Sequence, residues 1–146
     1  MSDQFIIRDA RAEDVSQLST LITQLGYPST AEEVQIRFSD ISQNPDYRSL
    51  VIAEGENVIA FAGLVKGLWY EKNGTYVRLL SFVVREDYRG RGIGKILIKA
   101  VEDWATALGC NSVVLGSGNR DDRITAHHFY KAQGYEIKSS GFIKVL

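Results

Sequence analysis

Residues 79–95 have the sequence LLSFVVREDYRGRGIGK, in which an apolar run leads into a charged turn with three glycines. The run from Leu79 to Val84 has the length and composition of a buried strand. Beyond the turn, apolar residues recur with the period of one helix face, at Ile93, Ile96, Leu97, Ala100, Val101, Trp104 and Leu108. The stretch is therefore predicted to form a strand, a glycine-rich turn and a helix.

This turn has the composition of an anion-binding site. Glycines at alternate positions leave the backbone N–H groups unobstructed, and they precede a helix N-terminus, where the helix dipole is positive. The basic residues that add charge are Arg89, Arg91 and Lys95. We expect the turn to bind a phosphate group.

Two common phosphate-binding motifs do not fit the turn. A dinucleotide fingerprint that starts at Gly90 would need glycine in place of Lys95. A P-loop would need glycine in place of Arg89 and serine or threonine in place of Ile96. The pattern that is present is R-x-x-G-x-G, formed by Arg89, Gly92 and Gly94.

This motif, between an apolar strand and a helix, resembles the signature of the GNAT superfamily of acetyl-CoA-dependent N-acetyltransferases, most of all its small aminoalkylphosphonate and aminoglycoside members. The resemblance implies a coenzyme A pyrophosphate site made by Arg89, Gly90, Arg91, Gly92, Ile93, Gly94 and Lys95. It also implies that the preceding strand bulges and splays from its partner. The backbone of Phe82, Val83 and Val84 would then bind the pantetheine arm and the acyl carbonyl.

A second stretch of resemblance is AHHFYKAQGY, residues 126–135. Tyr130 matches a family tyrosine whose hydroxyl protonates the departing thiolate, a role that suits a phenol. The alternative interpretation is a half-buried core tyrosine. Many family members hold the pantetheine arm with an asparagine seven residues earlier, where this chain has Arg123. Either Asn119 serves instead, or Arg123 faces the phosphates, or both are solvated loop residues.

The general base is left open by the sequence. Some relatives carry a catalytic carboxylate at the position of Ser81, and this chain does not. The remaining candidates are Glu54, Glu71, His127 or His128, or a water relayed by Ser81. No metal site is expected, because adjacent helical histidines diverge by about 100°.

Composition sets the broad class. The chain has 146 residues, 45% hydrophobic and 24% charged, with a net charge of −1. We expect one domain over residues 1–146, with no affinity for nucleic acid or membrane. A single cysteine, Cys110, forms no disulfide framework, and no signal peptide is evident, so a cytoplasmic location is expected.

The order of elements indicates the α/β class, with the GNAT fold: a mixed, mostly antiparallel twisted sheet with a central βαβ unit and flanking helices. Glu13 and Asp14 suit the first turn of a helix that ends at Gly26, and Thr30 with Glu33 predicts a capping box for the next helix. Strands are expected at 5–8, 50–53, 58–65, 75–84 and 112–117, a further helix at 123–132, and a last strand pair at 135–138 and 142–146.

The resemblance implies transfer of acetyl from acetyl-CoA to a primary amine by direct attack. The acceptor would be a small-molecule amine or a protein or peptide amine. An apolar terminal strand at 142–146 suggests a homodimer. The alternative is a non-catalytic acyl-CoA-binding sensor or interaction module, which the missing carboxylate at Ser81 favours. A nucleotide- or phosphate-binding regulator is a third hypothesis.

Overall fold

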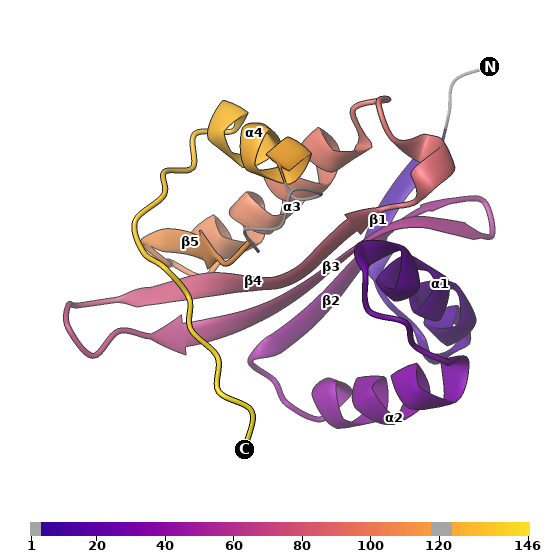
Figure 1. Cartoon of the computed structure of the whole chain (residues 1–146), viewed down its shortest axis with the longest axis horizontal. Helices are drawn as coiled ribbons and strands as arrows, with labels where there is room; N and C mark the ends of the chain where they lie inside the picture. The colour runs from indigo at the N-terminus through magenta and orange to yellow at the C-terminus, as the bar shows by residue number, and fades with distance from the viewer. Residues whose placement is uncertain (1–3, 118–123) are drawn as a thin grey trace. The chain divides into compact units, whose positions relative to one another are not determined.

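The computed structural model describes residues 4–117 and 124–146 (Figure 1). They form two compact units, one that ends at Val114 and one that begins at Leu115. The elements, in order, are β1 (Phe5–Asp9), the 3-10 helix η1 (Ala12–Asp14), α1 (Val15–Leu25), α2 (Ala31–Ser42), β2 (Tyr47–Glu54), β3 (Asn57–Leu68), β4 (Thr75–Val84), the 3-10 helix η2 (Glu86–Tyr88), α3 (Ile93–Ala107), β5 (Ser112–Leu115) and α4 (Ile124–Ala132).

The sheet has the strand order β1-β2-β3-β4-β5. The pairs β1–β2, β2–β3 and β3–β4 are antiparallel. The start of β5 lies beside the start of β4, because the N–H of Asn111 donates to the carbonyl oxygen of Thr75 at 2.9 Å. The strands β4 and β5, which α3 connects, therefore begin side by side. The predicted fold class is confirmed.

Helices cover both faces of this sheet. Figure 1 shows α1 and α2 on one side of the strands and α3 on the other. Val51, Phe61 and Val83 lie opposite one another across β2, β3 and β4, and they share a buried cluster with residues of α1 and α2. Side chains alternate between the faces of a sheet, so the intervening residues, such as Ile52 and Ala60, point toward the α3 side. Both are fully buried.

The loop between α1 and α2 is held at both ends by local chemistry. Gly26 ends α1 with a left-handed φ of 115°. Thr30 accepts a hydrogen bond from the N–H of Glu33 at 3.1 Å, and Glu33 accepts one from the N–H of Thr30 at 2.9 Å. The predicted capping box is confirmed, and it positions the loop over the sheet.

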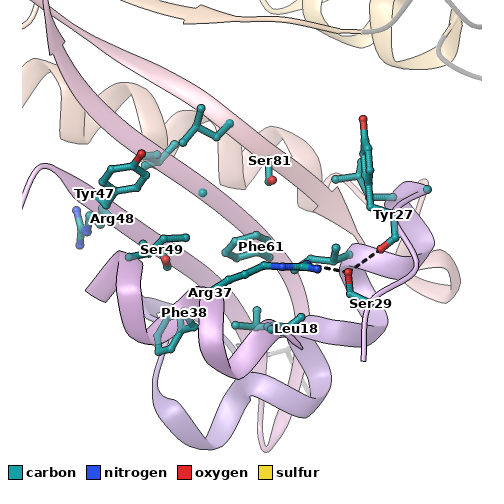
Figure 2. A pocket seen from close by; sticks show the side chains of 18 of the residues that line it. Leu18, Tyr27, Ser29, Arg37, Phe38, Tyr47, Arg48, Ser49, Phe61 and Ser81 are labelled. Atoms are coloured by element: carbon teal, nitrogen blue, oxygen red, sulfur yellow. Dashed lines mark hydrogen bonds between the residues drawn. The ribbon is translucent and has the colours of Figure 1, made fainter. Parts of the chain in front are cut away.

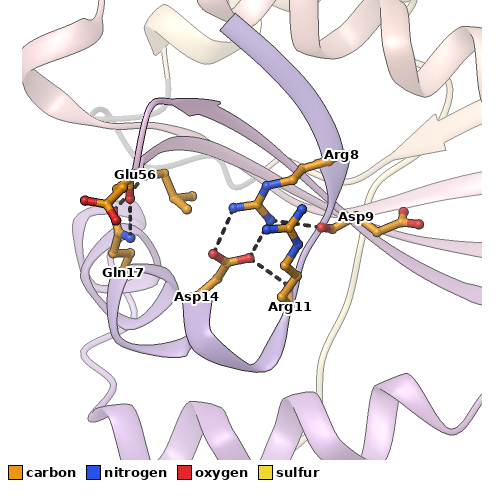
Figure 3. Close-up of polar contacts among 7 residues, drawn as sticks. Arg8, Asp9, Arg11, Asp14, Gln17 and Glu56 are labelled. Atoms are coloured by element: carbon orange, nitrogen blue, oxygen red, sulfur yellow. Dashed lines mark hydrogen bonds and ion pairs between the residues drawn. The ribbon is translucent and has the colours of Figure 1, made fainter.

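The entry to α1 is tied to β1 through Asp14 (Figure 3). The guanidinium of Arg8 donates two hydrogen bonds to the Asp14 carboxylate, at 2.7 and 3.0 Å. The N–H of Arg11 donates a third, at 2.7 Å. The hydrogen bonds from Arg8 outweigh burial and hold the pKa of the Asp14 carboxyl below its usual value.

The predicted last strand pair is wrong. Residues 135–146 contain neither helix nor strand. The apolar side chains of this segment are exposed, namely Ile137, Phe142, Ile143, Val145 and Leu146. An apolar pattern favours a strand only where a neighbouring strand supplies hydrogen bonds, and no described strand pairs with this segment. The prediction for 112–117 was also too long, because β5 ends at Leu115.

Candidate functional site

The glycine turn between η2 and α3 adopts a conformation that favours glycine. Gly90 and Gly92 have φ values of 79° and 80°, in the left-handed region. A Cβ atom added to either residue would meet no other atom within 4 Å. The turn therefore combines glycine-specific backbone with open space in front of it.

The N-terminus of α3 is open to an anion. Gly92 is the N-cap residue, and no side chain caps the helix. The first intrahelical bond in this region runs from the N–H of Ile96 to the carbonyl oxygen of Gly92, at 3.2 Å. The N–H groups of Ile93, Gly94 and Lys95 precede it, where a helix offers no internal acceptor. Together with the helix dipole, these donors give the turn the features of an anion cradle, and its binding of phosphate stays a prediction.

Charged residues brace the turn. Arg85 pairs with Asp87 at 2.7 Å, and the pKa of the Asp87 carboxyl is lowered, chiefly by these hydrogen bonds. The guanidinium carbons of Arg85 and Arg91 each lie 4.8 Å from the centre of the Tyr88 ring. Arg89 Nε donates to the carbonyl oxygen of Val84 at 3.0 Å, which ties the turn to the end of β4.

The strand before the turn has a bulge, as the resemblance implies. Ser81 pairs with Gly63 and Leu79 pairs with Leu64, so Leu80 has no partner in β3. Residues 81–84 then stay paired with β3. On its other side, β4 extends beyond the end of β5, because the four-residue β5 begins beside Thr75. The end of β4 thus forms an edge in the described part of the sheet.

The register assigns directions to the backbone amides at this edge. The N–H of Arg85 donates to the carbonyl oxygen of Ile59 at 2.8 Å, so Arg85 and Ile59 form a hydrogen-bonded pair. Such pairs alternate along an antiparallel ladder. The N–H of Val83 therefore points toward β3, whereas the N–H of Val84 points toward the edge. Of these two amides, that of Val84 is the one directed away from β3.

A cavity of about 660 Å³ lies between the α1–α2 loop and the sheet (Figure 2). Its floor includes Ser49, Gly63 and Ser81, which lie opposite one another on β2, β3 and β4. The small side chains of this row leave space above the sheet. In the next row, the ring of Phe61 occupies the corresponding space. Leu80 and Ser81 both line the cavity, so it reaches the bulge of β4.

The polar wall of the cavity comes from the α1–α2 loop and from α2. Arg37 Nη1 donates to Ser29 Oγ at 2.9 Å, and that hydroxyl donates to the carbonyl oxygen of Tyr27 at 2.9 Å (Figure 2). Arg48 also borders the cavity, but its guanidinium pairs with Asp9 at 2.8 Å and lies over the ring of Trp104. Among the described lining residues there is no carboxylate and no imidazole.

The candidate bases differ in their positions in the structure. Of these residues, only Ser81 lines the cavity. Glu54 accepts a hydrogen bond from the hydroxyl of Tyr88, which raises the pKa of that phenol, and Glu71 lies in the exposed loop after β3. His127 and His128 lie on α4, in the second unit.

Tyr130 is a buried residue of α4, with its ring centre 5.5 Å from that of Phe129 and 6.0 Å from that of Tyr135. Asn119 and Arg123 fall outside the described residues. Three residues that line the cavity were not predicted from the sequence, namely Arg37, Ser49 and Gly63. The last two carry no local signal, because only the strand register brings them together.

Residues 4–117 and 124–146 contain no cluster of three His, Cys, Asp or Glu side chains that could hold a metal ion. No helix within these same ranges has the length and apolar content needed to cross a membrane.

Comparisons with known proteins agree with this geometry. Residues 12–135 match the model of the acetyltransferase (GNAT) family. A thialysine N-epsilon-acetyltransferase of Bos taurus is 29% identical, over 88% of this chain and 82% of that protein. The crystal structure of a GNAT family acetyltransferase of Staphylococcus aureus has a TM-score of 0.83 and 32% identity, over 97% of this chain and 98% of the other. An aminoglycoside N-acetyltransferase in complex with CoA shares the fold, with a TM-score of 0.84 and 21% identity over 100% and 97%.

Proposed function

Since the chain belongs to the acetyltransferase (GNAT) family, we propose that it transfers the acetyl group of acetyl-CoA to a primary amine. The observation that carries this proposal is the order of features along β4. The bulge at Leu80 and Ser81 lines the cavity, the edge at Val84 follows, and the anion cradle comes next. An acceptor pocket, a thioester site and a diphosphate site would then follow one another along a single strand.

The cradle fits the coenzyme. The open space at Gly90 and Gly92 admits a diphosphate, and the uncapped N–H groups of α3 supply donors. Arg91 and Lys95 make no ion pair with described residues, so both can add charge. Coenzyme A bound to the aminoglycoside N-acetyltransferase supports the same cosubstrate here.

The reaction would be direct attack on the thioester. The amine nitrogen forms a bond to the acyl carbon, the negative charge on the carbonyl oxygen is stabilised by the N–H of Val84, and the carbon–sulfur bond then breaks. In the role that the resemblance to other family members implies, Tyr130 would donate its phenolic proton to the departing thiolate. Of the candidate bases, Ser81 lines the cavity, so a water relayed by its hydroxyl would take the proton of the amine and pass it to solvent.

The second candidate is an acyl-CoA-binding sensor without turnover. The observation that favours it is the lack of a base among the described lining residues of the cavity. Turnover separates the two candidates. If the protein binds acetyl-CoA and releases no CoA with any member of a broad panel of amines, the sensor is correct.

The cradle is tested by Gly92→Asp. The new carboxylate would lie where the diphosphate binds, so we expect acetyl-CoA affinity to fall by more than tenfold, above ~1.4 kcal/mol. Titration calorimetry with acetyl-CoA measures this affinity, and CoA release with the amine panel measures turnover.

Gly109→Asp is the matched control. Gly109 has a φ of 76° and the same open surroundings at the other end of α3. It reproduces the backbone strain without approaching the cradle, so its affinity should stay within twofold of the wild type. A folded Gly92→Asp protein that binds acetyl-CoA normally would refute the cradle assignment.

A further inference from the structure

The described charged side chains that line the cavity beside Ser81 are all positive. The cavity is lined by two arginines and, among the described residues, by no acid. Arg48 belongs to the opposite face of β2, since Ser49 and Val51 face α1 and α2, and it is already paired with Asp9. Arg37 is therefore the charged side chain that extends into the cavity (Figure 2).

Arg37 is available to a ligand. Its side chain is exposed, and its one hydrogen bond to a described residue is to the neutral hydroxyl of Ser29. Glu33 stands one helical turn earlier, but its carboxylate accepts the N–H of Thr30 in the capping box. No described carboxylate lies within ion-pair distance of Arg37. The guanidinium fork can therefore receive an anion without breaking an existing pair.

The cavity has two chemically different ends. Ser81 lies on the β4 side, next to the bulge that leads to Val84, and Arg37 reaches in from α2 on the other side (Figure 2). The apolar side chain of Phe61 lies between them, and other apolar side chains, including Leu18 and Phe38, line the rest of the cavity (Figure 2). This arrangement suits a molecule with a reactive group at one end, an anion at the other and an apolar connection.

We propose that the acceptor is a small primary amine that also carries an anionic group, a carboxylate or a phosphate, and that Arg37 binds this group. The proposal rests on the proposed acetyl transfer and adds the substrate class. The anion at Arg37 directs the amine toward Ser81 and the edge of β4. A second ammonium group in place of the anion meets an arginine and no acidic side chain among the described lining residues of the cavity, so diamines and other polycations bind poorly.

The test uses matched amines that differ only at the far end: aminohexanoate, aminohexyl phosphate, the neutral aminohexanamide and diaminohexane. With wild-type protein and acetyl-CoA, we expect kcat/KM to be at least tenfold higher for an anionic amine than for the neutral amide, and lowest for the diamine. The carboxylate and phosphate compounds show which anion is preferred. Equal kcat/KM for the anionic and neutral amines would overturn the proposal.

Arg37→Gln should remove the preference. We expect its kcat/KM for the anionic amines to fall at least tenfold, while the value for the neutral amide stays within twofold of the wild type. Lys99→Gln removes one positive charge from the exposed surface of α3 and should change neither. If Arg37→Gln keeps the anion preference, Arg37 is not the anion-binding residue.

A binding measurement makes the inference independent of turnover. In the presence of CoA, the product analogue acetamidohexanoate should bind wild-type protein at least tenfold more tightly than its amide, and Arg37→Gln should abolish the difference. Selective binding without turnover of any amine would refute acetyl transfer and leave the anion-binding cavity standing. Turnover without anion selectivity would refute the substrate class alone, and failure of the anionic analogue to bind would also overturn it.

Discussion

Asp14 is the acidic side chain that the described part of the chain buries most fully, with 4% of its surface exposed. A buried carboxylate is stable only when hydrogen-bond donors replace the water it loses. Arg8 and the N–H of Arg11 supply three donors to it. The network joins β1 to the start of α1, the helix that forms one wall of the candidate acceptor cavity. A residue far from the chemistry thus supports the site.

The hydrogen bonds to Asp14 predict a pH-dependent stability. Its folded-state pKa lies below the unfolded value of about 3.9. The ionised carboxylate therefore stabilises the fold above the unfolded pKa, and this contribution is lost as the pH falls through the folded pKa. We expect Asp14→Asn to lower the free energy of unfolding by about 2–3 kcal/mol at neutral pH, and by less below about pH 4.

Urea unfolding at several pH values measures this difference. Asp103→Asn is the control, because its pair with Lys99 is an exposed i,i+4 pair and should be worth less than about 0.5 kcal/mol. A loss in Asp14→Asn that is the same at neutral and acidic pH would contradict the electrostatic explanation.

Tyr130 is the residue to which the proposed reaction assigns the acid role. Tyr130→Phe removes only the hydroxyl of a buried ring that packs beside Phe129 and Tyr135, so the fold and acetyl-CoA affinity should change little. General acid catalysis typically contributes ~10²–10⁴-fold, and we expect kcat to fall at least tenfold. The rate of CoA release at saturating substrates measures kcat. An unchanged rate under conditions in which chemistry limits turnover would make the hydroxyl structural.

At the scale of elements, β4 joins the three parts of the candidate site. Its bulge at Leu80 brings two consecutive side chains, Leu80 and Ser81, to the cavity. Beyond the bulge, pairing with β3 directs the N–H of Val84 to the open edge. The length of β4 relative to β5 creates that edge. In the proposed reaction, a change in any one of these three features would move the acceptor relative to the thioester.

The end of β3 shows how packing selects a glycine. A Cβ atom on Gly67 would lie 2.4 Å from the ring of Tyr76 on the neighbouring strand. Tyr76 in turn stacks on Trp69, whose ring N–H donates to Asn111 at 2.9 Å. The hairpin is therefore joined to the residue that precedes β5. This connection positions the start of β5 beside β4.

At the scale of the whole molecule, the exposed apolar residues of 135–146 are the reason to predict that the protein dimerises. Four large apolar side chains, Phe142, Ile143, Val145 and Leu146, are each at least 88% exposed. Burying them against a second copy would remove that surface from water. We expect light scattering at micromolar concentration to give the mass of two 16.3 kDa chains, and a Phe142→Ser, Ile143→Ser variant to give one. A monomer mass for the wild type would contradict this prediction.

Local chemistry was sufficient for much of the fold. The capping box of Thr30 and Glu33, the glycine that ends α1 and the glycine turn before α3 all depend on residues within a few positions of one another. Their backbone conformations follow from side-chain size and hydrogen-bonding groups, which adjacent residues carry. Hydrophobic periodicity also predicted α3, because this helix buries one face. It failed at 142–146, because a strand also needs a partner.

The acceptor cavity depends instead on residues far apart in the chain. Ser49, Gly63 and Ser81 form one row only because β2, β3 and β4 pair in a particular register, and Arg37 reaches that row from a helix on the same face. A shift of one residue would turn each side chain to the other face of the sheet. Strand register is set by the packing of the whole sheet, so the cavity and its charge could not be predicted from neighbouring residues.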